Sequence, residues 1–114
     1  MEEVVKGMQK NKAPGPDGFT TEFFQATWHF KGQDILEVVA ESRRNQKACP
    51  SLNATFIALI PKTLESKDPQ GFRPIALCNG IYKIIATLIV KRLKPLLPNL
   101  ISPKQIGFVE GRQI

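Results

Sequence analysis

The hydrophobic pattern changes at residue 53, and this change limits the possible folds of the 114-residue chain more than any other feature. Residues 53–62 read NATFIALIPK, a run of β-branched and aromatic side chains that favours a buried strand. A polar loop, TLESKDPQG, separates this run from a second apolar run, FRPIAL. The two runs predict a β-hairpin with a long tip, in which Pro74 places the second strand at an edge or near a bulge.

Helical periodicity precedes the hairpin. Val4, Val5 and Met8 predict a short amphipathic helix over residues 2–10. The segment NKAPGPDG at 11–18 then favours tight turns, because two prolines and two glycines within five positions oppose a helix. The first helix is therefore expected to end before this turn.

Two further helices are expected between the turn and the hairpin. Thr20 is a suitable N-cap for the first, whose apolar face includes Phe24 and Trp28. After Gly32 a second helix is expected to run to about residue 46, with basic residues at its C-terminal end, where cations are favoured.

A long amphipathic helix is predicted after the hairpin, from residue 80. Its apolar face comprises Ile81, Ile84, Ile85 and Leu88. A second face, here called the basic stripe, comprises Lys83, Thr87, Lys91 and Lys94, and we expect it to face solvent or phosphate. The whole pattern indicates an α+β fold: a helical N-terminal half, a β-hairpin and then this helix.

The positive charge is concentrated in the C-terminal half. Residues 1–61 carry seven basic and seven acidic side chains, whereas residues 62–114 carry nine and three, which accounts for the net charge of +6. This asymmetry fits a polyanionic partner such as nucleic acid or nucleotide phosphate. Simple solubilising charge is an equally valid interpretation of the same numbers.

The cysteines indicate neither a zinc site nor a disulfide framework. Cys49 and Cys78 lie 29 positions apart, without a companion histidine or cysteine at ligand spacing. We expect both to be reduced thiols in an intracellular protein, nuclear or cytoplasmic. The N-terminal MEEVVKGMQKNK lacks a signal-peptide core, and lysines interrupt the most apolar later stretch, so no membrane partner is expected.

The acidic residues argue against catalysis by this chain alone. Polymerase-type phosphoryl transfer needs two divalent ions held by clustered carboxylates. The aspartates are Asp17, Asp34 and Asp68, and no two of them share a strand or a tight motif. We therefore assign no catalytic residue and no metal ligand.

Phosphate binding is better supported than catalysis. If the two strands pair, Lys62 at the end of one and Arg73 at the start of the other could point toward a common anion. Lysine supplies a compact charge and arginine a bidentate fork, the combination expected for a triphosphate. Basic residues that flank a hairpin are more often solvated surface charges, and both interpretations stay open here.

Four ordered blocks give the chain a specific resemblance. KAPGPDGFTTEFF, FIALIPK, FRPIALCNGIYKIIATLIVKRLKPLLP and QIGFVEGRQI together resemble the reverse transcriptase of plant LINE-type, non-LTR retrotransposons. The resemblance covers nearly the whole chain. It implies that residues 1–114 are a partial reverse transcriptase domain, comprising the fingers and the start of the palm of a right-hand polymerase fold. The enzyme of that family copies element RNA into DNA.

The resemblance also implies roles for particular residues. Arg73 and Lys62 resemble the finger residues that contact the incoming nucleotide triphosphate. A QxGFxxGR block near the template and nucleotide pocket is matched by Gln105, Gly107, Phe108 and Arg112. We assign the lysines of the basic stripe, Lys83, Lys91 and Lys94, to the nucleic-acid backbone. The implied partners are an RNA template, a DNA primer and deoxynucleotide triphosphates.

The metal-binding aspartate motifs of the family are absent from these 114 residues. The complete family enzyme would use Mg²⁺, whereas this chain alone is expected to hold no cofactor and to be inactive. Two alternatives stay open: a non-catalytic nucleic-acid-binding module and a non-functional retroelement remnant.

Overall fold

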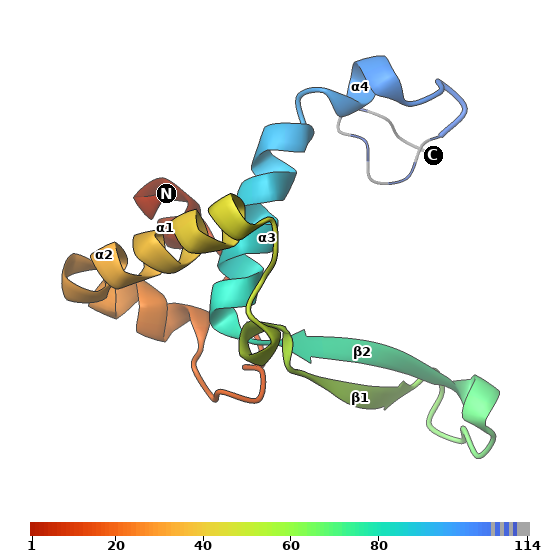
Figure 1. The fold of residues 1–114 in the computed structure, drawn as a ribbon. Helices are drawn as coiled ribbons and strands as arrows, with labels where there is room; N and C mark the ends of the chain where they lie inside the picture. The colour runs from red at the N-terminus through yellow and green to blue at the C-terminus, as the bar shows by residue number, and fades with distance from the viewer. Residues whose placement is uncertain (106, 108, 110, 112–114) are drawn as a thin grey trace.

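The structure of the chain, a computed structural model, describes residues 1–105, 107, 109 and 111. Helices and one two-stranded antiparallel sheet make it an α+β fold, as the sequence predicts. In chain order the elements are α1 (Glu2–Lys6), α2 (Thr21–Asn45), η1 (Pro50–Asn53), β1 (Thr55–Pro61), η2 (Pro69–Gly71), β2 (Phe72–Cys78), α3 (Gly80–Leu93) and α4 (Leu97–Leu100). Figure 1 shows α1, α2 and α3 gathered together, with the β1–β2 hairpin projecting from them as an arm.

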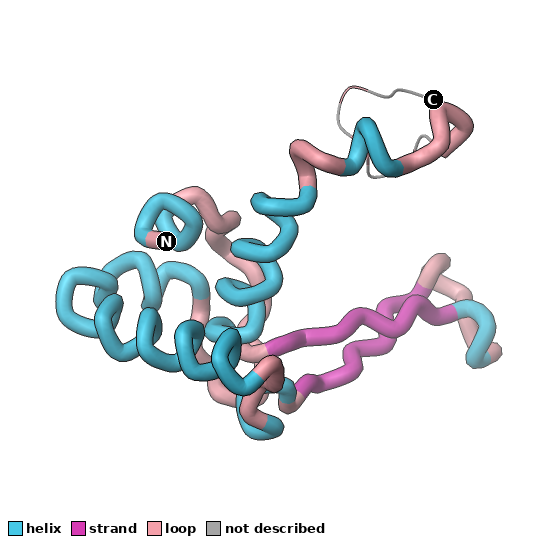
Figure 2. The backbone as a smooth tube through the Cα atoms, turned by 45° about the horizontal axis from the view of Figure 1, so that its top comes forward, coloured by secondary structure: helices cyan, strands magenta, loops and turns pink. Residues whose placement is uncertain are grey.

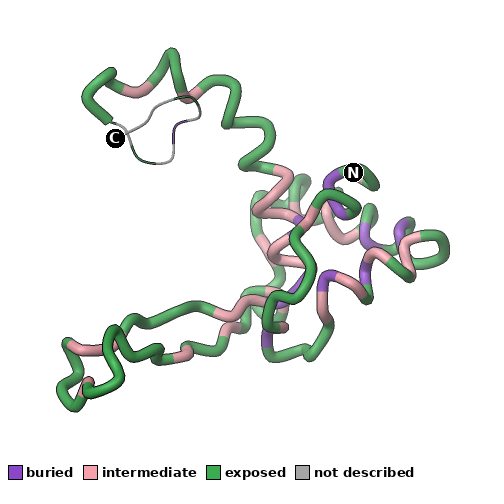
Figure 3. The backbone as a smooth tube through the Cα atoms, turned by 180° about the vertical axis from the view of Figure 1, so that it is seen from behind, coloured by how far each residue is buried: buried purple, intermediate pink, exposed green. Residues whose placement is uncertain are grey.

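The core lies where α1, α2 and α3 meet. Val5, Phe24, Ile35 and Ile84 form one buried cluster, and Val5 and Ile84 are fully enclosed. Partly buried Met1, Met8, Trp28, Val39 and Ile81 surround this cluster. Ile81 and Ile84 of the apolar face predicted for α3 therefore pack on the N-terminal helices, and most of the buried residues gather there (Figure 3).

The second helix differs from its predicted form. We expected two helices that meet at Gly32, but α2 runs unbroken from Thr21 to Asn45. One glycine in a helix costs only about 1 kcal/mol relative to alanine, which packing can offset. A Cβ at Gly32 would lie 2.9 Å from the Trp28 ring, so the glycine leaves room for the indole.

The start of α2 follows the prediction. Phe23 donates its backbone N–H to the Thr20 hydroxyl over 3.3 Å, which is the expected N-cap. The side chain of Gln25 ties α1 to this helix, because its amide nitrogen donates to the carbonyl oxygens of Val5 and Met8 at 2.9 and 3.1 Å. These bonds satisfy carbonyl groups at the C-terminal end of α1.

The turn before α2 packs against the end of β2. A Cβ at Gly15 would lie 2.4 Å from the carbonyl carbon of Cys78, so only glycine permits this approach of two backbones. Gly18 adopts a φ of +74°, and Asp17 accepts a bond from the Phe19 N–H over 3.1 Å. The predicted turn is thus confirmed, and the Asp17 side chain bonds the backbone within it.

The predicted hairpin is confirmed, but its predicted burial is wrong. β1 and β2 pair along their whole lengths, from Thr55 opposite Cys78 to Pro61 opposite Phe72. The apolar side chains of the strands are nonetheless exposed, 58% for Phe56 and 62% for Leu59. A two-stranded ribbon has no second layer to cover either face, and Figure 2 shows it standing clear of the helices.

Asn79 joins three segments at the base of the hairpin. Its Oδ1 accepts a bond from the Asp17 N–H, and its Nδ2 donates to the Ser51 carbonyl, each over 3.0 Å. The residue is 5% exposed. It therefore fixes the turn and the η1 segment to the start of α3.

Replacing Asn79 by alanine is expected to lower the free energy of unfolding by about 2 kcal/mol, because two backbone groups lose their partner in a buried site. Urea unfolding followed by circular dichroism measures the change. Asn53→Ala is the control at an exposed asparagine and should change stability by less than about 0.5 kcal/mol. Equal effects of the two substitutions would contradict the bridging role of Asn79.

Candidate functional site

The hairpin register puts Lys62 and Arg73 on one face. Ile60 lies opposite Arg73, and Lys62 follows Ile60 by two positions, so strand alternation gives all three the same side. The backbone N–H of Lys62 donates to the carbonyl of Gly71 over 2.8 Å, which continues the ladder by one residue. The two cations are thus diagonal neighbours near the hairpin tip.

The two cations differ in their local contacts. Lys62 Nζ donates to the carbonyl oxygen of Gln70 over 2.7 Å, which folds its side chain back toward the tip. Arg73 is exposed. Because an ammonium has three donors, two of the Lys62 donors remain available to an anion alongside the guanidinium of Arg73.

The basic stripe faces the N-terminal segment in part. Lys83 is half-buried and donates to the carbonyl of Ala13 over 2.8 Å. The Thr87 hydroxyl donates to the Lys83 carbonyl over 2.8 Å. Lys91 Nζ lies near Gly7, at 3.8 Å from the place where a Cβ would be. The expectation that this face meets only solvent or phosphate is therefore wrong for Lys83, whose ammonium also holds the segment before the turn.

The residues expected near a template and nucleotide pocket lie at the C-terminal end, far along the chain from the hairpin tip. The backbone of Gln105 donates to the Ser102 carbonyl over 3.0 Å, and its side-chain amide donates to the Gly107 carbonyl over 3.5 Å. Phe108 and Arg112 lie outside the described residues.

Metal ligands do not gather in the described part of the chain. Among residues 1–105, 107, 109 and 111, no three histidine, cysteine, aspartate or glutamate side chains are close enough to hold a metal ion. The same residues contain no helix with the length and apolar character needed to span a membrane.

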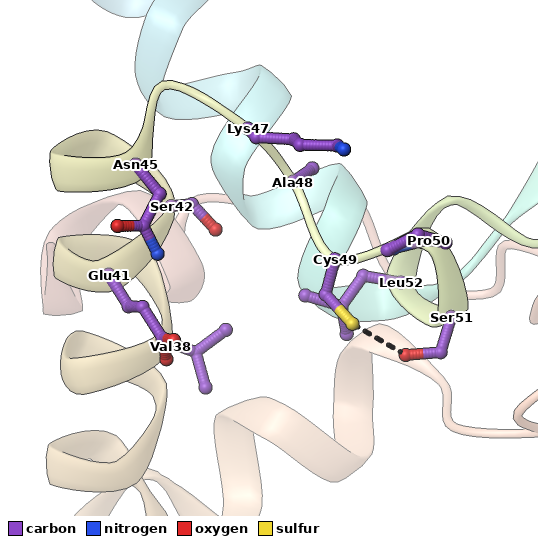
Figure 4. A pocket seen from close by; sticks show the side chains of 10 residues that line it. All are labelled: Val38, Glu41, Ser42, Asn45, Lys47, Ala48, Cys49, Pro50, Ser51 and Leu52. Carbon is purple, nitrogen blue, oxygen red and sulfur yellow. Dashed lines mark hydrogen bonds between the residues drawn. The ribbon is translucent and has the colours of Figure 1, made fainter.

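A pocket of about 460 Å³ lies between the C-terminal half of α2 and η1, and sequence reasoning missed it. Figure 4 shows Cys49 within it, beside Ser51 and Leu52. The thiol and the Ser51 hydroxyl are 3.0 Å apart. Bonds from the Ser51 hydroxyl, the Ser51 N–H and the Leu52 N–H lower the pKa of the Cys49 thiol, against an opposing effect of Glu41. The available sequence signal was a cysteine directly before a helical turn, with a serine two positions on.

Alkylation of Cys49 is expected to begin at lower pH in the natural chain than in Ser51→Ala. The lowered pKa of the thiol means that the reactive thiolate forms at lower pH. Iodoacetamide labelling across a pH series, resolved by peptide mass spectrometry, measures this for each cysteine. Cys78 serves as an internal control and should keep one profile in both proteins. Superimposable Cys49 profiles would contradict the role of the Ser51 bonds.

No family model matches the chain. It is 35% identical over 114 residues to the transposon TX1 uncharacterized 149 kDa protein of Xenopus laevis, an alignment that covers 100% of this chain and 9% of that protein. It is 27% identical over 118 residues to the retrovirus-related Pol polyprotein from type-1 retrotransposable element R1 of Bradysia coprophila, covering 98% of this chain and 12% of that protein. The chain thus spans only a small part of the curated relatives it matches. Since essentially its whole length aligns with a transposon protein and with a Pol polyprotein of a retrotransposable element, this chain is a retrotransposon-related protein.

Proposed function

We propose that this chain is part of the reverse transcriptase of a LINE-type, non-LTR retrotransposon of plants, comprising the fingers and the start of the palm. Its four ordered sequence blocks support this proposal, as does its likeness to a Pol polyprotein of a retrotransposable element. In this proposal residues 1–114 belong to one partial reverse transcriptase domain with a right-hand polymerase fold.

The observation that carries the proposal is the common face of Lys62 and Arg73 near the hairpin tip. The triphosphate of an incoming deoxynucleotide would lie across this face. Arg73 would bind two phosphate oxygens with its planar fork, while Lys62 would turn from Gln70 toward the same group. These residues bind and orient the nucleotide, and they neither form nor break a covalent bond.

The remaining assignments concern the nucleic acid. Lys83, Lys91 and Lys94 would contact the backbone of the RNA template or DNA primer. The pocket for the template base and nucleotide would include Gln105, Gly107, Phe108 and Arg112. The excess of nine basic over three acidic side chains in residues 62–114 supports this partner, and it equally supports the alternative of a non-catalytic nucleic-acid-binding module.

Nucleotide binding tests the proposal directly. Arg73→Ala is expected to weaken binding of a fluorescent deoxynucleotide triphosphate by about tenfold, because one charge-assisted interaction of about 1.4 kcal/mol is lost. Fluorescence anisotropy in magnesium-containing buffer measures the dissociation constant of the 114-residue chain. The corresponding nucleoside, which has no phosphate, should bind equally weakly to both proteins.

Lys67→Ala is the matched control, since Lys67 is an exposed cation in the loop at the same hairpin tip. It should leave the dissociation constant within about twofold, as expected of a screened surface charge. If both substitutions weaken binding equally, the triphosphate is attracted by the overall positive charge of the hairpin tip and does not bind specifically to the Lys62–Arg73 face. RNA binding without any preference for the triphosphate would favour the nucleic-acid-binding module.

A further inference from the structure

Helix α3 carries a second apolar face besides the one in the core. Tyr82, Ile85, Ile89 and Leu93 recur at spacings of three, four and four, so they fall on one side of the helix. Ile89 is 52% exposed and Leu93 48% exposed, whereas Ile84 on the core face is fully buried. This second face is called the outer stripe below.

Three residues of the outer stripe, Tyr82, Ile85 and Ile89, form one wall of a groove of about 410 Å³. The opposite wall is the C-terminal end of α2 and the segment after it, with Val39 and Ala48 supplying apolar surface. The ribbon in Figure 1 shows this end of α2 crossing beside α3. A groove of this size and apolar lining can take several side chains of a docked segment.

Three cations surround the groove: Arg43 and Lys47 from the α2 side, and Arg92 from α3. Among the described residues that line it, none is an aspartate or glutamate. In the described part of the chain the salt bridges are Lys6 to Glu2 and Lys31 to Asp34, so neither involves these three cations. A neighbouring depression shared by Arg43 and Arg92 adds Arg44, and its described lining again contains no carboxylate side chain.

We infer that this groove binds an acidic amphipathic helix of a partner polypeptide. The partner helix would place leucine-like side chains along the outer stripe, at the i, i+3, i+4 and i+7 spacing of helix-in-groove recognition. Its glutamates or aspartates would lie against Arg43, Lys47 and Arg92, where charge complementarity also fixes its orientation. The inference is independent of nucleotide binding, because the groove includes no residue of the hairpin.

The lining distinguishes this occupant from nucleic acid. A phosphate backbone would pair with the three cations but would leave Ile85 and Ile89 of the groove without apolar contacts. An amphipathic helix covers both kinds of surface at once, since it removes the aliphatic side chains from water while its acidic face meets the cations.

A synthetic peptide of about 18 residues, with leucines on one helical face and glutamates on the other, is the probe. Anisotropy of the fluorescein-labelled peptide measures its binding to the 114-residue chain. Ile89→Ser is expected to weaken binding about tenfold through lost apolar contact. Arg92→Glu is expected to weaken it about tenfold as well, and to reduce its dependence on salt.

Matched controls separate the groove from the rest of the surface. Val90→Ser changes a 57% exposed apolar residue beside the outer stripe, and Lys67→Glu reverses a charge at the hairpin tip. Both should bind the peptide within about twofold of the natural chain. A peptide of the same composition with its leucines scattered around the helix should bind at least about tenfold more weakly. Circular dichroism establishes that each variant keeps its helical content.

Several results would overturn the inference. Unchanged peptide binding by Ile89→Ser, or equal binding of the scattered peptide, would remove the role of the outer stripe. Single-stranded DNA of equal charge that displaces the peptide as well as unlabelled peptide does would assign the groove to nucleic acid. Self-association that Ile89→Ser abolishes, without peptide binding, would assign the groove to a second copy of the chain.

Discussion

Replacing Phe24 by alanine is expected to lower the free energy of unfolding by about 4 kcal/mol, the usual cost of removing an enclosed aromatic ring. Phe24 is 5% exposed and belongs to the core cluster of α1, α2 and α3. Its ring lies edge-on to Phe23, with centroids 5.5 Å apart, and against the backbone of Gly80. Chemical denaturation measures the loss, which in a core this small can abolish the cooperative transition.

The close approach of Phe24 to Gly80 allows a sharper test. A Cβ at Gly80 would lie 2.1 Å from Phe24 Cε2, so Gly80→Ala alone should be strongly destabilising. Once the ring is removed, the same methyl group enters the vacated space. The loss in free energy of unfolding in the double variant should therefore be smaller than the sum of the two single losses by at least about 1 kcal/mol.

Phe30→Ala is the control for the aromatic substitution. Phe30 lies in the same helix but is 58% exposed, so its removal should change stability by less than about 0.5 kcal/mol. Additive effects of Phe24→Ala and Gly80→Ala would contradict the contact between the ring and the start of α3.

The second large effect concerns catalysis in a longer enzyme. In a polymerase that contains this chain together with metal-binding carboxylates, Arg73→Ala is expected to lower the efficiency of nucleotide incorporation by about 30- to 100-fold. This corresponds to about 2–3 kcal/mol of lost stabilisation by a bidentate phosphate contact. Single-nucleotide extension on an RNA template gives kcat/KM for both proteins.

Lys67→Ala in the same enzyme is the control and should keep kcat/KM within about twofold, because Lys67 is a solvated charge of the loop. If Arg73→Ala keeps the kcat/KM of the natural enzyme, the guanidinium has no role in binding the triphosphate. A loss confined to template affinity would instead place Arg73 on the nucleic acid.

Local sequence signals predicted the elements that depend on neighbouring residues. The Thr20 cap, the turn at Asp17 and Gly18, and the pairing of FIALIP with FRPIAL all arise from interactions within a few residues or across one hairpin. The apolar face of α3 was also predictable, since its period is helical and Ile84 lies at its centre.

The predictions failed where tertiary contacts determine the local structure. Gly32 looks like a helix boundary, yet the Trp28 ring packs over it within one helix. The β1 run looks like a buried strand, but burial requires a second layer that the β1–β2 ribbon alone does not provide. Lys83 belongs to a basic stripe by period, whereas Ala13, distant in sequence, accepts a bond from its ammonium. The diagonal placement of Lys62 and Arg73 likewise depends on a register that composition does not encode.

The Asn79 bridge gives the hairpin the mechanics of a lever. The arm is clamped at its base, where one side chain bonds to Asp17 and Ser51, while its apolar strands stand free of the helices. A force applied at the tip, near Lys62 and Arg73, acts over the full length of both strands on the contacts at this base, which also include the packing of Gly15 on Cys78. Asn79 is followed by Gly80, which lies against the Phe24 ring. Bending of the hairpin would therefore first disturb the packing of the core.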